Sequence, residues 1–385
     1  MRYDISIIGG GPAGAMAALA ASRRGAKTIL IDDKQPGVPY VSACAEGVGD
    51  AVLKSLGLSE GPWVMNRCHN IKITAPNGTT RVLAPKGLTA LVLDRAAFEA
   101  SLIAQASEYP NFNYSPGYRA TSISGHKSGI NYWKTLDVQS IQTGEIEKVD
   151  SLIVIDCSGI RATIAKQAGL YMPPLKRSDI GVCSQYRVLS PELDEDTFEL
   201  WFGSKYGAPR GYIWVFPKTS CYSNVGIGVP GGQGVDTKKN LEEFINWRFG
   251  RYAEFRSHYI RASIPLAPPL RQVSTPDGIM VAGDAARFCI STTGAGIGMA
   301  LWSGREAGAV AANHLKGHLP LSHYDDICHK TIIPKLERAY RLKNRVTKSD
   351  ESMQRYFYAL QPLLWLHNVA PRWVEKRAAR NMRFA

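Results

Sequence analysis

Three glycines near the N-terminus have the spacing of a loop that holds phosphate groups. Residues 9–14 read Gly-Gly-Gly-Pro-Ala-Gly, so that Gly9, Gly11 and Gly14 form the pattern G-x-G-x-x-G. In such a loop the first glycine permits a tight turn, the second lets a pyrophosphate approach the backbone, and the third lets a helix pack closely against a strand. Asp32 follows at the distance where an acid accepts hydrogen bonds from ribose hydroxyls. These residues predict a dinucleotide site.

A second glycine-rich motif, near the other end of the chain, indicates which dinucleotide binds. An apolar run at 278–282 leads into Gly283 and Asp284, and a glycine-rich turn at 294–298 opens a helix. A simple NAD site has no need for such a motif so far downstream. FAD has that need, because its ribityl chain and flavin ring extend beyond the first βαβ unit and require a hydroxyl acceptor and a helix dipole. The two motifs together predict FAD.

Alternate residues from position 212 onward are aromatic. Tyr212, Trp214 and Phe216 would share one face of a strand, because side chains in a strand alternate with period two. Pro217 is expected to end the strand. An aromatic face is typical of ordinary sheet packing or of the wall of a pocket for a large apolar ligand. The small residues at 224–228 favour the pocket, because they would let the neighbouring strand pass close to a chain-like ligand.

The segments around the first glycines supply the elements that the dinucleotide site needs. Residues 4–8 form a short apolar run, an Ala-rich segment follows Gly14, and residues 26–33 form a second apolar run. This order of strand, glycine turn, helix and strand is one βαβ unit. The N-terminus of its helix presents free N–H groups to the phosphates.

The length and composition indicate a globular protein of the α/β class with more than one core. A chain of 385 residues exceeds the size at which one hydrophobic core keeps growing. We expect a Rossmann-type FAD-binding domain, an interleaved and mostly antiparallel β-sheet substrate domain, and a C-terminal helical region. The expected ranges are 1–60, 85–168 and 275–320 for the first, 61–84 and 169–274 for the second, and 321–385 for the third.

The cysteines and the hydropathy exclude several classes of protein. The seven cysteines are odd in number, scattered and never in a C-x-x-C pair, which argues against a disulfide framework and a zinc site, so no metal is expected. No apolar run reaches the roughly 18 residues that span a bilayer. A strand-like segment begins at about Tyr3, which leaves no room for a signal peptide. We expect a cytoplasmic protein.

The C-terminal region is strongly basic. The net charge is +13, and from Lys330 to the end thirteen Lys and Arg residues stand against four Asp and Glu. No nucleic-acid-binding signature accompanies this charge, so nucleic acid is not an expected partner. An anionic membrane surface and a phosphorylated substrate explain the charge equally well. Residues 356–380 join apolar aromatic residues to cations, as in a helix at the inner face of a membrane or a helix that closes over the substrate domain.

Several motifs resemble the para-hydroxybenzoate-hydroxylase-like FAD enzymes over essentially the whole chain. They are the glycine turn at 9–14, the segment LDRAAFEASL with Arg95, and the Gly283-Asp284 pair. The resemblance implies that Arg95 lies near the flavin or its phosphates and that Asp284 contacts the ribityl chain. The segment VIDCSG, with Asp156, is similar to a strand and turn near FAD in that group. A helix-start salt bridge is the other interpretation of Arg95.

Two further motifs resemble the geranylgeranyl reductase family. The segment ACAEGVG at 43–49 is similar to its Cys-x-Glu-Gly segment, and YIWVFP followed by Val225-Gly226 is similar to its aromatic signature. The resemblance implies FAD-dependent reduction of isolated double bonds in geranylgeranyl-type chains of a membrane lipid or a prenyl diphosphate precursor. NAD(P)H and a ferredoxin are the expected electron donors. In place of the family's glycine and proline the chain carries Arg287 and Ser291.

Two other functions stay open at this point. One is an FAD-dependent monooxygenase or halogenase for an aromatic substrate, although a halogenase would carry W-x-W-x-I-P where this chain has YIWVFP. The other is a non-catalytic protein that binds flavin and lipid. Only the site can decide between reactions, because one fold hosts many.

The reductase interpretation demands an acid beside the flavin, because an isolated double bond accepts hydride only when a proton reaches its other carbon. The candidates for this role are Cys44, Glu46 and Tyr212. The expected contacts to FAD are Gly9, Gly11, Pro12, Ala13, Gly14, Asp32, Cys44, Ala45, Arg95, Asp156, Gly283, Asp284, Gly294, Ala295, Gly296 and Ile297. The expected contacts to the substrate are Tyr212, Trp214, Phe216, Pro217 and Gly226.

Overall fold

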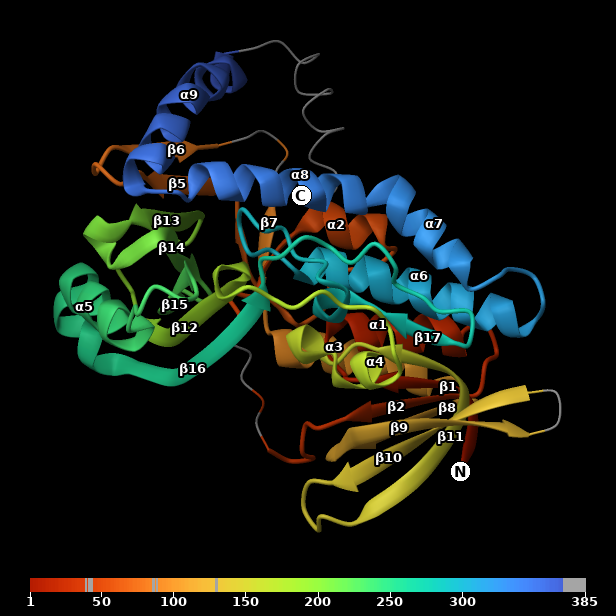
Figure 1. Ribbon diagram of the computed structural model, residues 1–385. Coiled ribbons are helices and arrows are strands. Elements are labelled where there is room, and N and C mark those ends of the chain that lie inside the picture. The colour runs from red at the N-terminus through yellow and green to blue at the C-terminus, as the bar shows by residue number, and fades with distance from the viewer. Residues whose placement is uncertain (39, 41–43, 85–86, 88, 129–130, 370–385) are drawn as a thin grey trace.

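Two seven-stranded sheets and one three-stranded sheet form the framework of the protein. The structure is a computed structural model that describes residues 1–38, 40, 44–84, 87, 89–128 and 131–369. In Figure 1 the first sheet lies at the bottom, the second lies to the upper left, and a band of helices crosses the top. The predicted fold class, α/β with a Rossmann-type parallel sheet and a mostly antiparallel second sheet, is confirmed.

The first sheet brings the ends of its parallel strands to one edge. Its strands in spatial order are β8 (Phe112–Pro116), β2 (Thr28–Asp32), β1 (Arg2–Ile8), β11 (Ile146–Asp156), β10 (Asn131–Ser140) and β9 (Tyr118–Ser128), with β17 (Ile279–Val281) paired to β11. Strands β8, β2, β1, β11 and β17 are parallel, and β9 and β10 pair antiparallel beside them. Ligands of open α/β sheets bind beyond the carboxyl ends of such strands, and here the glycine turn, Asp32 and Asp284 lie there.

Two helices rich in small residues pack closely above this sheet. Helix α1 (Pro12–Ser22) follows the glycine turn, and α6 (Ile297–Leu315) follows the second glycine-rich motif. A Cβ built at Gly304 would lie 2.0 Å from the carbonyl oxygen of Ala13, and one at Gly308 would lie 2.3 Å from that of Ala17. Only glycine at these two positions permits this approach, which ties the two nucleotide motifs together.

The second sheet buries one face against a helix. Its strands in spatial order are β16 (Arg256–Pro265), β12 (Ile180–Leu189), β15 (Tyr222–Pro230), β14 (Ala208–Pro217), β13 (Thr197–Gly203), β5 (Asn70–Thr74) and β6 (Thr80–Leu83). All neighbours are antiparallel except β13 and β5. Helix α5 (Thr237–Phe249) covers one face, where Ile213 and Val215 pack with Leu241 and Ile245. The opposite face carries the aromatic residues of β14.

The third sheet is short, and its strands are β3 (Gly47–Gly49), β7 (Ala90–Leu93) and β4 (Val64–Cys68). Helices α2 (Asp50–Ser55), α3 (Arg95–Ser107) and α4 (Thr163–Gln167) accompany the sheets. The short 3-10 segments are Gly159–Arg161, Arg177–Asp179, Ser204–Tyr206, Gly250–Phe255 and Gly283–Ala286. The range 61–84, predicted to belong to the substrate domain, contains strands of two sheets, because β4 lies in the third sheet and β5 and β6 lie in the second. The division of the chain into domains stays a prediction.

Three helices at the C-terminal end cross the top of the molecule in Figure 1. They are α7 (Ser322–Thr331), α8 (Ile333–Val346) and α9 (Asp350–Val369). Helix α9 contacts the second sheet, where the rings of Phe357 and Phe202 lie 5.0 Å apart, centroid to centroid. Across the described ranges, the helices lack the length and apolar character needed to cross a bilayer.

Candidate active site

The glycine turn leaves open space in front of helix α1. Gly9 has φ +95°, and a Cβ there would lie 2.7 Å from the carbonyl oxygen of Cys157. A Cβ at Gly14 would lie 1.8 Å from the carbonyl oxygen of Gly9, so both positions require glycine. A Cβ at Gly11 meets only an Arg95 nitrogen, at 3.9 Å, so the second glycine opens the space that a pyrophosphate would occupy. This difference among the glycines fits a dinucleotide.

Asp32 ends strand β2 and lies buried beside the glycine turn. Its Oδ2 accepts a hydrogen bond from the Tyr114 hydroxyl at 3.3 Å and lies 3.4 Å from Lys34 Nζ. A Cβ at Gly10 would lie only 2.2 Å from the same oxygen, so Gly10 is the glycine that makes room for Asp32. The motif G-x-G-x-x-G does not assign this role to Gly10, because Gly10 occupies the first x, where the motif allows any residue.

A buried carboxylate, Glu99 on α3, holds two cations beside the turn. Glu99 is 2% exposed, and its oxygens lie 2.8 Å from Lys34 Nζ and 2.6 Å from Arg95 Nε. Lys34 also donates to the carbonyl oxygen of Gly10 at 2.8 Å. Burial acts against the charge of Lys34, but Glu99 and Asp32 outweigh it and raise the pKa of Lys34. Arg95 begins α3 and pairs with Glu99, as the salt-bridge interpretation expects. It also lines the cavity described next, and its place beside the flavin or its phosphates stays a prediction.

Asp284 faces the same space from the second motif. It follows strand β17, and Gly283, with φ +62°, places it there. Burial raises the pKa of Asp284 to about 6, and the nearby Arg95 opposes this increase. Its carboxyl group has no hydrogen-bond partner among the described residues. It is therefore an acceptor turned toward a ligand that would supply the donor, as a ribityl hydroxyl would.

Two cavities meet beside these motifs. The nucleotide cavity, of about 360 Å³, is lined by the glycine turn, Asp32, Arg95 and Asp284. The apolar cavity, of about 530 Å³, lies against the second sheet and the C-terminal helices. The residues that line both are Cys44, Ile264, Gly294, Gly296 and Ile297. A ligand with its phosphates at the glycine turn and its ring at these shared residues fits the shape and chemistry of FAD.

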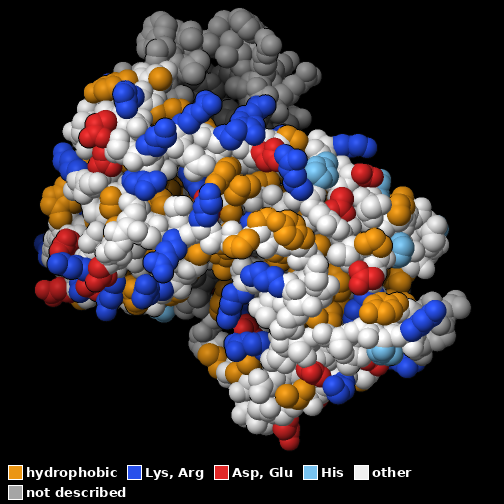
Figure 2. All heavy atoms as spheres, in the orientation of Figure 1, with side chains coloured by type: hydrophobic (Ala, Val, Ile, Leu, Met, Phe, Trp, Pro, Cys, Tyr) orange, Lys and Arg blue, Asp and Glu red, His pale blue; other side chains and the backbone are white. Residues whose placement is uncertain are grey.

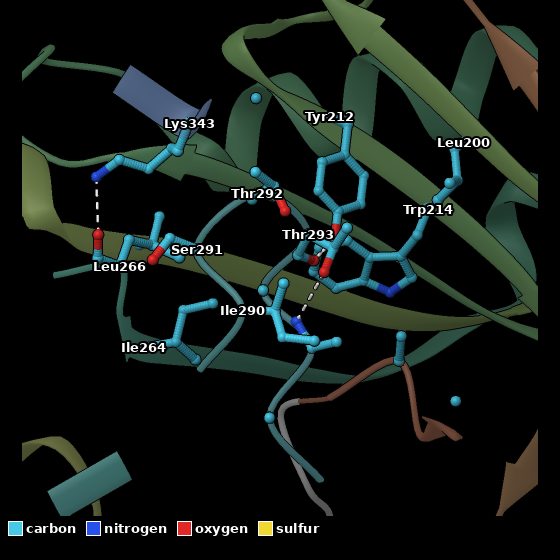
Figure 3. Close-up of a pocket in the computed structure, with 18 of the residues that line it drawn as sticks. Leu200, Tyr212, Trp214, Ile264, Leu266, Ile290, Ser291, Thr292, Thr293 and Lys343 are labelled. Carbon is cyan, nitrogen blue, oxygen red and sulfur yellow. Dashed lines mark hydrogen bonds between the residues drawn. The ribbon is translucent and has the colours of Figure 1, made fainter. Parts of the chain in front are cut away.

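The aromatic face of β14 forms one wall of the apolar cavity. Tyr212, Trp214 and Phe216 all line it, whereas Ile213 and Val215 point into the core under α5. The predicted separation of an aromatic face from an aliphatic face is confirmed. Figure 3 shows Tyr212 and Trp214 side by side above the loop that contains Ile290 and Thr293. The Phe216 ring stacks on Phe198 with centroids 3.9 Å apart.

Of the two glycines of strand β15, Gly228 lines the apolar cavity, whereas Gly226 has a different reason from the one expected. Trp214 pairs in register with Gly226, and its Nε1 donates to Gln185 Oε1 at 3.0 Å. Gly226 does not line either cavity, because the indole covers it. Pro217, the last residue of β14, also lies outside both linings, and its carbonyl oxygen accepts from Asn66 Nδ2 at 2.9 Å. The small residue therefore makes room for an aromatic ring of the protein.

Tyr212 and Cys44 are the two candidate acids that reach the cavities. The Tyr212 hydroxyl donates a hydrogen bond to the carbonyl oxygen of Thr293, in the loop before α6. Burial, together with nearby cysteines, raises the pKa of Tyr212 well above its ordinary value, so its hydroxyl keeps its proton. Cys44 is half-buried, lines both cavities, and accepts from the Glu46 N–H at 3.3 Å. Cys44 lies in the shared region and Tyr212 in the wall of the apolar cavity, and the role of each as the proton donor stays a prediction.

Glu46, the third candidate, lies behind the cavities instead. Its side chain forms a buried ion pair with Lys218 and accepts from Asn224 Nδ2 at 2.8 Å. Its other oxygen accepts from the Arg95 N–H at 3.2 Å, and its backbone has φ +65°. It lines neither cavity. These contacts suit a residue that fixes the segment 44–46 against α3, and a non-local lysine such as Lys218 gives no signal in the sequence.

The remaining predicted cofactor contacts divide into residues that line a cavity and residues that do not. Pro12, Ala13, Gly294, Gly296 and Ile297 line the nucleotide cavity, and Ala45 and Ala295 line the apolar cavity. Gly14 and Gly283 act through the packing described above. Asp156 lines neither cavity. Its oxygens accept from the N–H groups of Ser158 and Ala165, each at 2.9 Å, so it fixes the turn after β11 and its predicted contact with FAD stays a prediction.

The two unusual residues after Asp284 are both buried. Arg287 has φ +59°, and its guanidinium donates to the carbonyl oxygen of Pro173. Burial lowers the pKa of Arg287, and Asp179 opposes this decrease. Ser291 lines the apolar cavity, and its hydroxyl has no hydrogen-bond partner among the described residues.

Comparisons with known proteins agree with these motifs. A sequence profile for the geranylgeranyl reductase catalytic domain matches residues 179–262, and one for FAD-dependent oxidoreductases matches residues 4–36. Digeranylgeranylglycerophospholipid reductase of Methanoculleus marisnigri is 34% identical over 318 residues, which are 81% of this chain and 77% of that protein. Digeranylgeranylglycerophospholipid reductase 1 of Methanococcoides burtonii is 30% identical over 88% of this chain and 80% of that protein.

A solved structure supports the same grouping. The crystal structure of a geranylgeranyl bacteriochlorophyll reductase-like protein from Thermoplasma acidophilum superposes with a TM-score of 0.81 at 26% identity. The superposition covers 92% of this chain and 90% of that one. The likeness therefore extends over both large sheets.

Proposed function

Because the chain belongs to the digeranylgeranylglycerophospholipid reductase family, we propose that its substrate carries geranylgeranyl chains on a phosphoglycerolipid or is a prenyl diphosphate precursor. It is an FAD-dependent oxidoreductase that reduces the double bonds of geranylgeranyl chains. The resemblance on which the sequence prediction rests is confirmed, as is FAD as the cofactor. The exact lipid, the proton donor and the electron donor are proposals.

One observation carries the assignment of the substrate to this site. The apolar cavity meets the nucleotide cavity at Cys44 and at the loop before α6. An apolar chain in the first cavity would therefore lie beside a flavin ring whose phosphates occupy the second. With a chain bound, the aromatic and aliphatic wall would limit the access of water to the reacting carbons.

The residues of the chain have distinct roles in this proposal. Bound FAD, once reduced, supplies a hydride. Trp214 and Phe216 hold the prenyl chain against the shared region and keep water away from it. The Cys44 thiol, which lines both cavities, delivers a proton to the second carbon of the double bond, and Tyr212 is the alternative donor. Glu46, paired with Lys218, positions the segment that carries Cys44.

Mass spectrometry of the lipid product tests the function. The purified FAD-containing protein would be reduced with dithionite without oxygen and incubated with geranylgeranyl diphosphate or a digeranylgeranyl phospholipid. The expected product gains two hydrogens for each double bond reduced, and no gain occurs without protein. A protein that leaves both lipids unsaturated, but consumes oxygen with an aromatic substrate, would contradict the proposal.

The electron donor and the contact with a membrane complete the proposal. NAD(P)H and a ferredoxin are the proposed donors, and the rate of flavin bleaching with each one separates them. We place the enzyme in the cytoplasm, in peripheral contact with the inner face of a membrane. The exposed cations of α8, namely Lys335, Arg338, Arg341 and Arg345, support that contact. Figure 2 shows Lys and Arg side chains along the upper part of the visible face, where α8 runs in Figure 1.

A further inference from the structure

The apolar cavity has two cationic residues in its lining. Arg210 and Lys343 are its only charged residues within the described ranges, and the rest of the wall is mainly aliphatic and aromatic. Neither residue belongs to the set that the cavity shares with the nucleotide cavity. In Figure 3 Lys343 and Leu266 lie on one side of the cavity, and Trp214 and Leu200 lie on the other. The cavity therefore has a polar side of its own, away from Trp214.

Two of the three ammonium hydrogens of Lys343 have oxygen acceptors among the described residues, and its Nζ also lies 4.5 Å from the centroid of the Tyr340 ring. The residue is 4% exposed, and its Nζ donates to Asp179 Oδ1 at 3.0 Å and to the carbonyl oxygen of Leu266 at 2.8 Å. An ammonium group has three N–H donors, so one is left without an oxygen acceptor among the described residues. Burial lowers the pKa of Lys343, Asp179 opposes this, and the nearby Arg210 lowers it further. A buried cation beside a second cation is costly unless a further anion approaches.

Arg210 is brought to the cavity by an irregularity in the sheet. Between strands β13 and β14 the register passes from Phe202 opposite Tyr212 to Gly203 opposite Ala208, so residues 209–211 bulge out of the ladder. Bulges re-aim side chains and are common next to functional sites. Arg210 lies in this bulge with φ +58°, a conformation that costs energy in a residue with a side chain.

The guanidinium of Arg210 is incompletely used by the protein. Its Nε donates to the carbonyl oxygen of Thr347 at 2.5 Å. No carboxylate of the described residues forms a salt bridge with it, and its two terminal nitrogens have no acceptor there. Arg210 and Lys343 together carry two positive charges against the single carboxylate of Asp179. One positive charge is therefore left at the edge of an apolar cavity.

A hydroxyl group completes this polar side. Ser291 is 4% exposed, lines the apolar cavity, and its Oγ has no hydrogen-bond partner among the described residues. Figure 3 shows Ser291 next to Leu266, on the same side as Lys343. A buried hydroxyl without a partner is uncommon, because a buried polar group loses its hydrogen bonds to water and gains none in return. A ligand atom that accepts its hydrogen would remove that cost.

We propose that Arg210, Lys343 and Ser291 form a subsite for the phosphate group of a prenyl substrate. Arg and Lys are the side chains that bind phosphate oxygens most strongly, Arg through its fork of N–H groups. The subsite rests on the proposed function and deepens it, because it names the residues that would hold the anionic phosphate end of the prenyl substrate. Anchoring that end fixes which double bonds of the chain reach Cys44, so the subsite sets the regiochemistry.

Binding of two ligands with the same chain and different ends tests the subsite. Titration calorimetry on the FAD-containing oxidised protein would compare geranylgeranyl diphosphate with uncharged geranylgeraniol. We expect Arg210→Gln to weaken the diphosphate about 10- to 100-fold, the loss typical of a hydrogen bond to a charged group, and to leave the alcohol within about 3-fold. Ser291→Ala should weaken the binding of the diphosphate alone, and by a smaller factor than Arg210→Gln. Arg251→Gln, at an exposed position of the 3-10 segment Gly250–Phe255 and outside both cavity linings, is the matched control and should change neither.

Each further outcome has a defined meaning. Equal weakening of both ligands by Arg210→Gln overturns the subsite, since it would indicate a change in the shape of the cavity. Inorganic diphosphate that binds as tightly as the prenyl diphosphate overturns the assignment to a lipid and points to a free anion. A wild-type protein that binds neither prenyl compound refutes the proposed function itself. Lys343→Met is the second variant of the subsite, and the absorbance of its bound FAD shows whether it is folded. A folded variant should also bind the diphosphate more weakly and the alcohol unchanged.

Discussion

The indole of Trp214 lies against Gly226 on the neighbouring strand, so closely that a Cβ at position 226 would stand 2.1 Å from Cζ2 of the ring. The two residues are partners in the register of β14 and β15. The glycine thus sets the tilt of a tryptophan that forms a wall of the apolar cavity. A backbone position on one strand determines the shape of the lipid site through a ring on the next.

Substitution of Gly226 is therefore expected to disturb the lipid site and spare the cofactor site. Gly226→Ala must displace the indole or the strand, and overpacking of this kind costs about 1–3 kcal/mol. We expect kcat/KM for the prenyl substrate to fall at least 10-fold while the bound FAD spectrum is unchanged. Gly228→Ala is the comparison variant, because it adds the same methyl group at the wall of the apolar cavity but its Cβ would meet Trp214 at an ordinary 3.4 Å. Equal losses in both variants would refute this explanation.

Removal of the charge on Glu99 should weaken FAD binding. Glu99 holds Lys34 and Arg95 together, and without it the two cations repel each other beside the pyrophosphate site. We expect Glu99→Gln to raise the Kd for FAD at least 10-fold, measured by fluorescence titration of FAD-free protein. Glu108→Gln, exposed at the end of the same helix, is the control. An unchanged Kd would show that Glu99 serves stability alone.

The stability of the FAD-free protein should depend on pH through Asp284. Its folded-state pKa is about 6, above the ordinary 3.8, because burial disfavours the carboxylate. The folded state therefore binds the proton more tightly than the unfolded state, and stability falls as the pH rises from about 4 to 6. Asp284→Asn should remove this loss. Urea midpoints at pH 5 and pH 8 measure it, and the variant should gain more over the wild type at pH 8.

The proton donor can be identified from rates. A group that supplies the proton contributes about 100- to 10,000-fold to the chemical step. We expect Cys44→Ala to lower kcat at least 100-fold in single turnovers with reduced enzyme, with little change in lipid binding. Tyr212→Phe should lower kcat by a smaller factor. Glu46→Gln should act mainly on stability, so that the melting temperature falls while kcat changes little. If Tyr212→Phe alone abolishes the reaction, the roles of the tyrosine and the cysteine are exchanged.

Helix α8 should mediate binding to anionic vesicles. Each basic residue near such a surface contributes about 1 kcal/mol. The triple variant Lys335→Glu, Arg338→Glu and Arg341→Glu is expected to lower co-sedimentation with phosphatidylglycerol vesicles at least 10-fold. Turnover of a detergent-dispersed substrate should persist. Lys238→Glu with Lys239→Glu, on α5, is the control, and equal losses in both variants would argue against α8 as the contact.

Many residues of this site can be predicted from local patterns in the sequence. Gly9, Gly11 and Asp32 are predictable because a strand, a turn and a helix place them within one βαβ unit. The aromatic face of β14 is predictable because strand period fixes it. The place of Asp284 at the end of a strand is predictable because the apolar run at 278–282 leads directly into the Gly283-Asp284 pair.

Contacts between distant segments are not predictable in this way. Glu99 binds Lys34 across separate elements, and Lys218 meets Glu46 only because a strand of the second sheet passes behind residue 46. The expectation that Glu46 is a candidate acid follows from its motif, whereas its burial beside a lysine depends on the tertiary fold. Gly226 is marked by the sequence as a special position, but only the register of the strands reveals the ring that requires it.

The apolar cavity draws its walls from residues between Cys44 and Phe357, whereas the lining of the nucleotide cavity ends at Ala300. During translation, the residues that contact the cofactor have therefore all been synthesised before α8 and α9 exist. The apolar cavity is complete only once α8 and α9 have been added, since Lys343 of α8 and Phe357 of α9 belong to its wall.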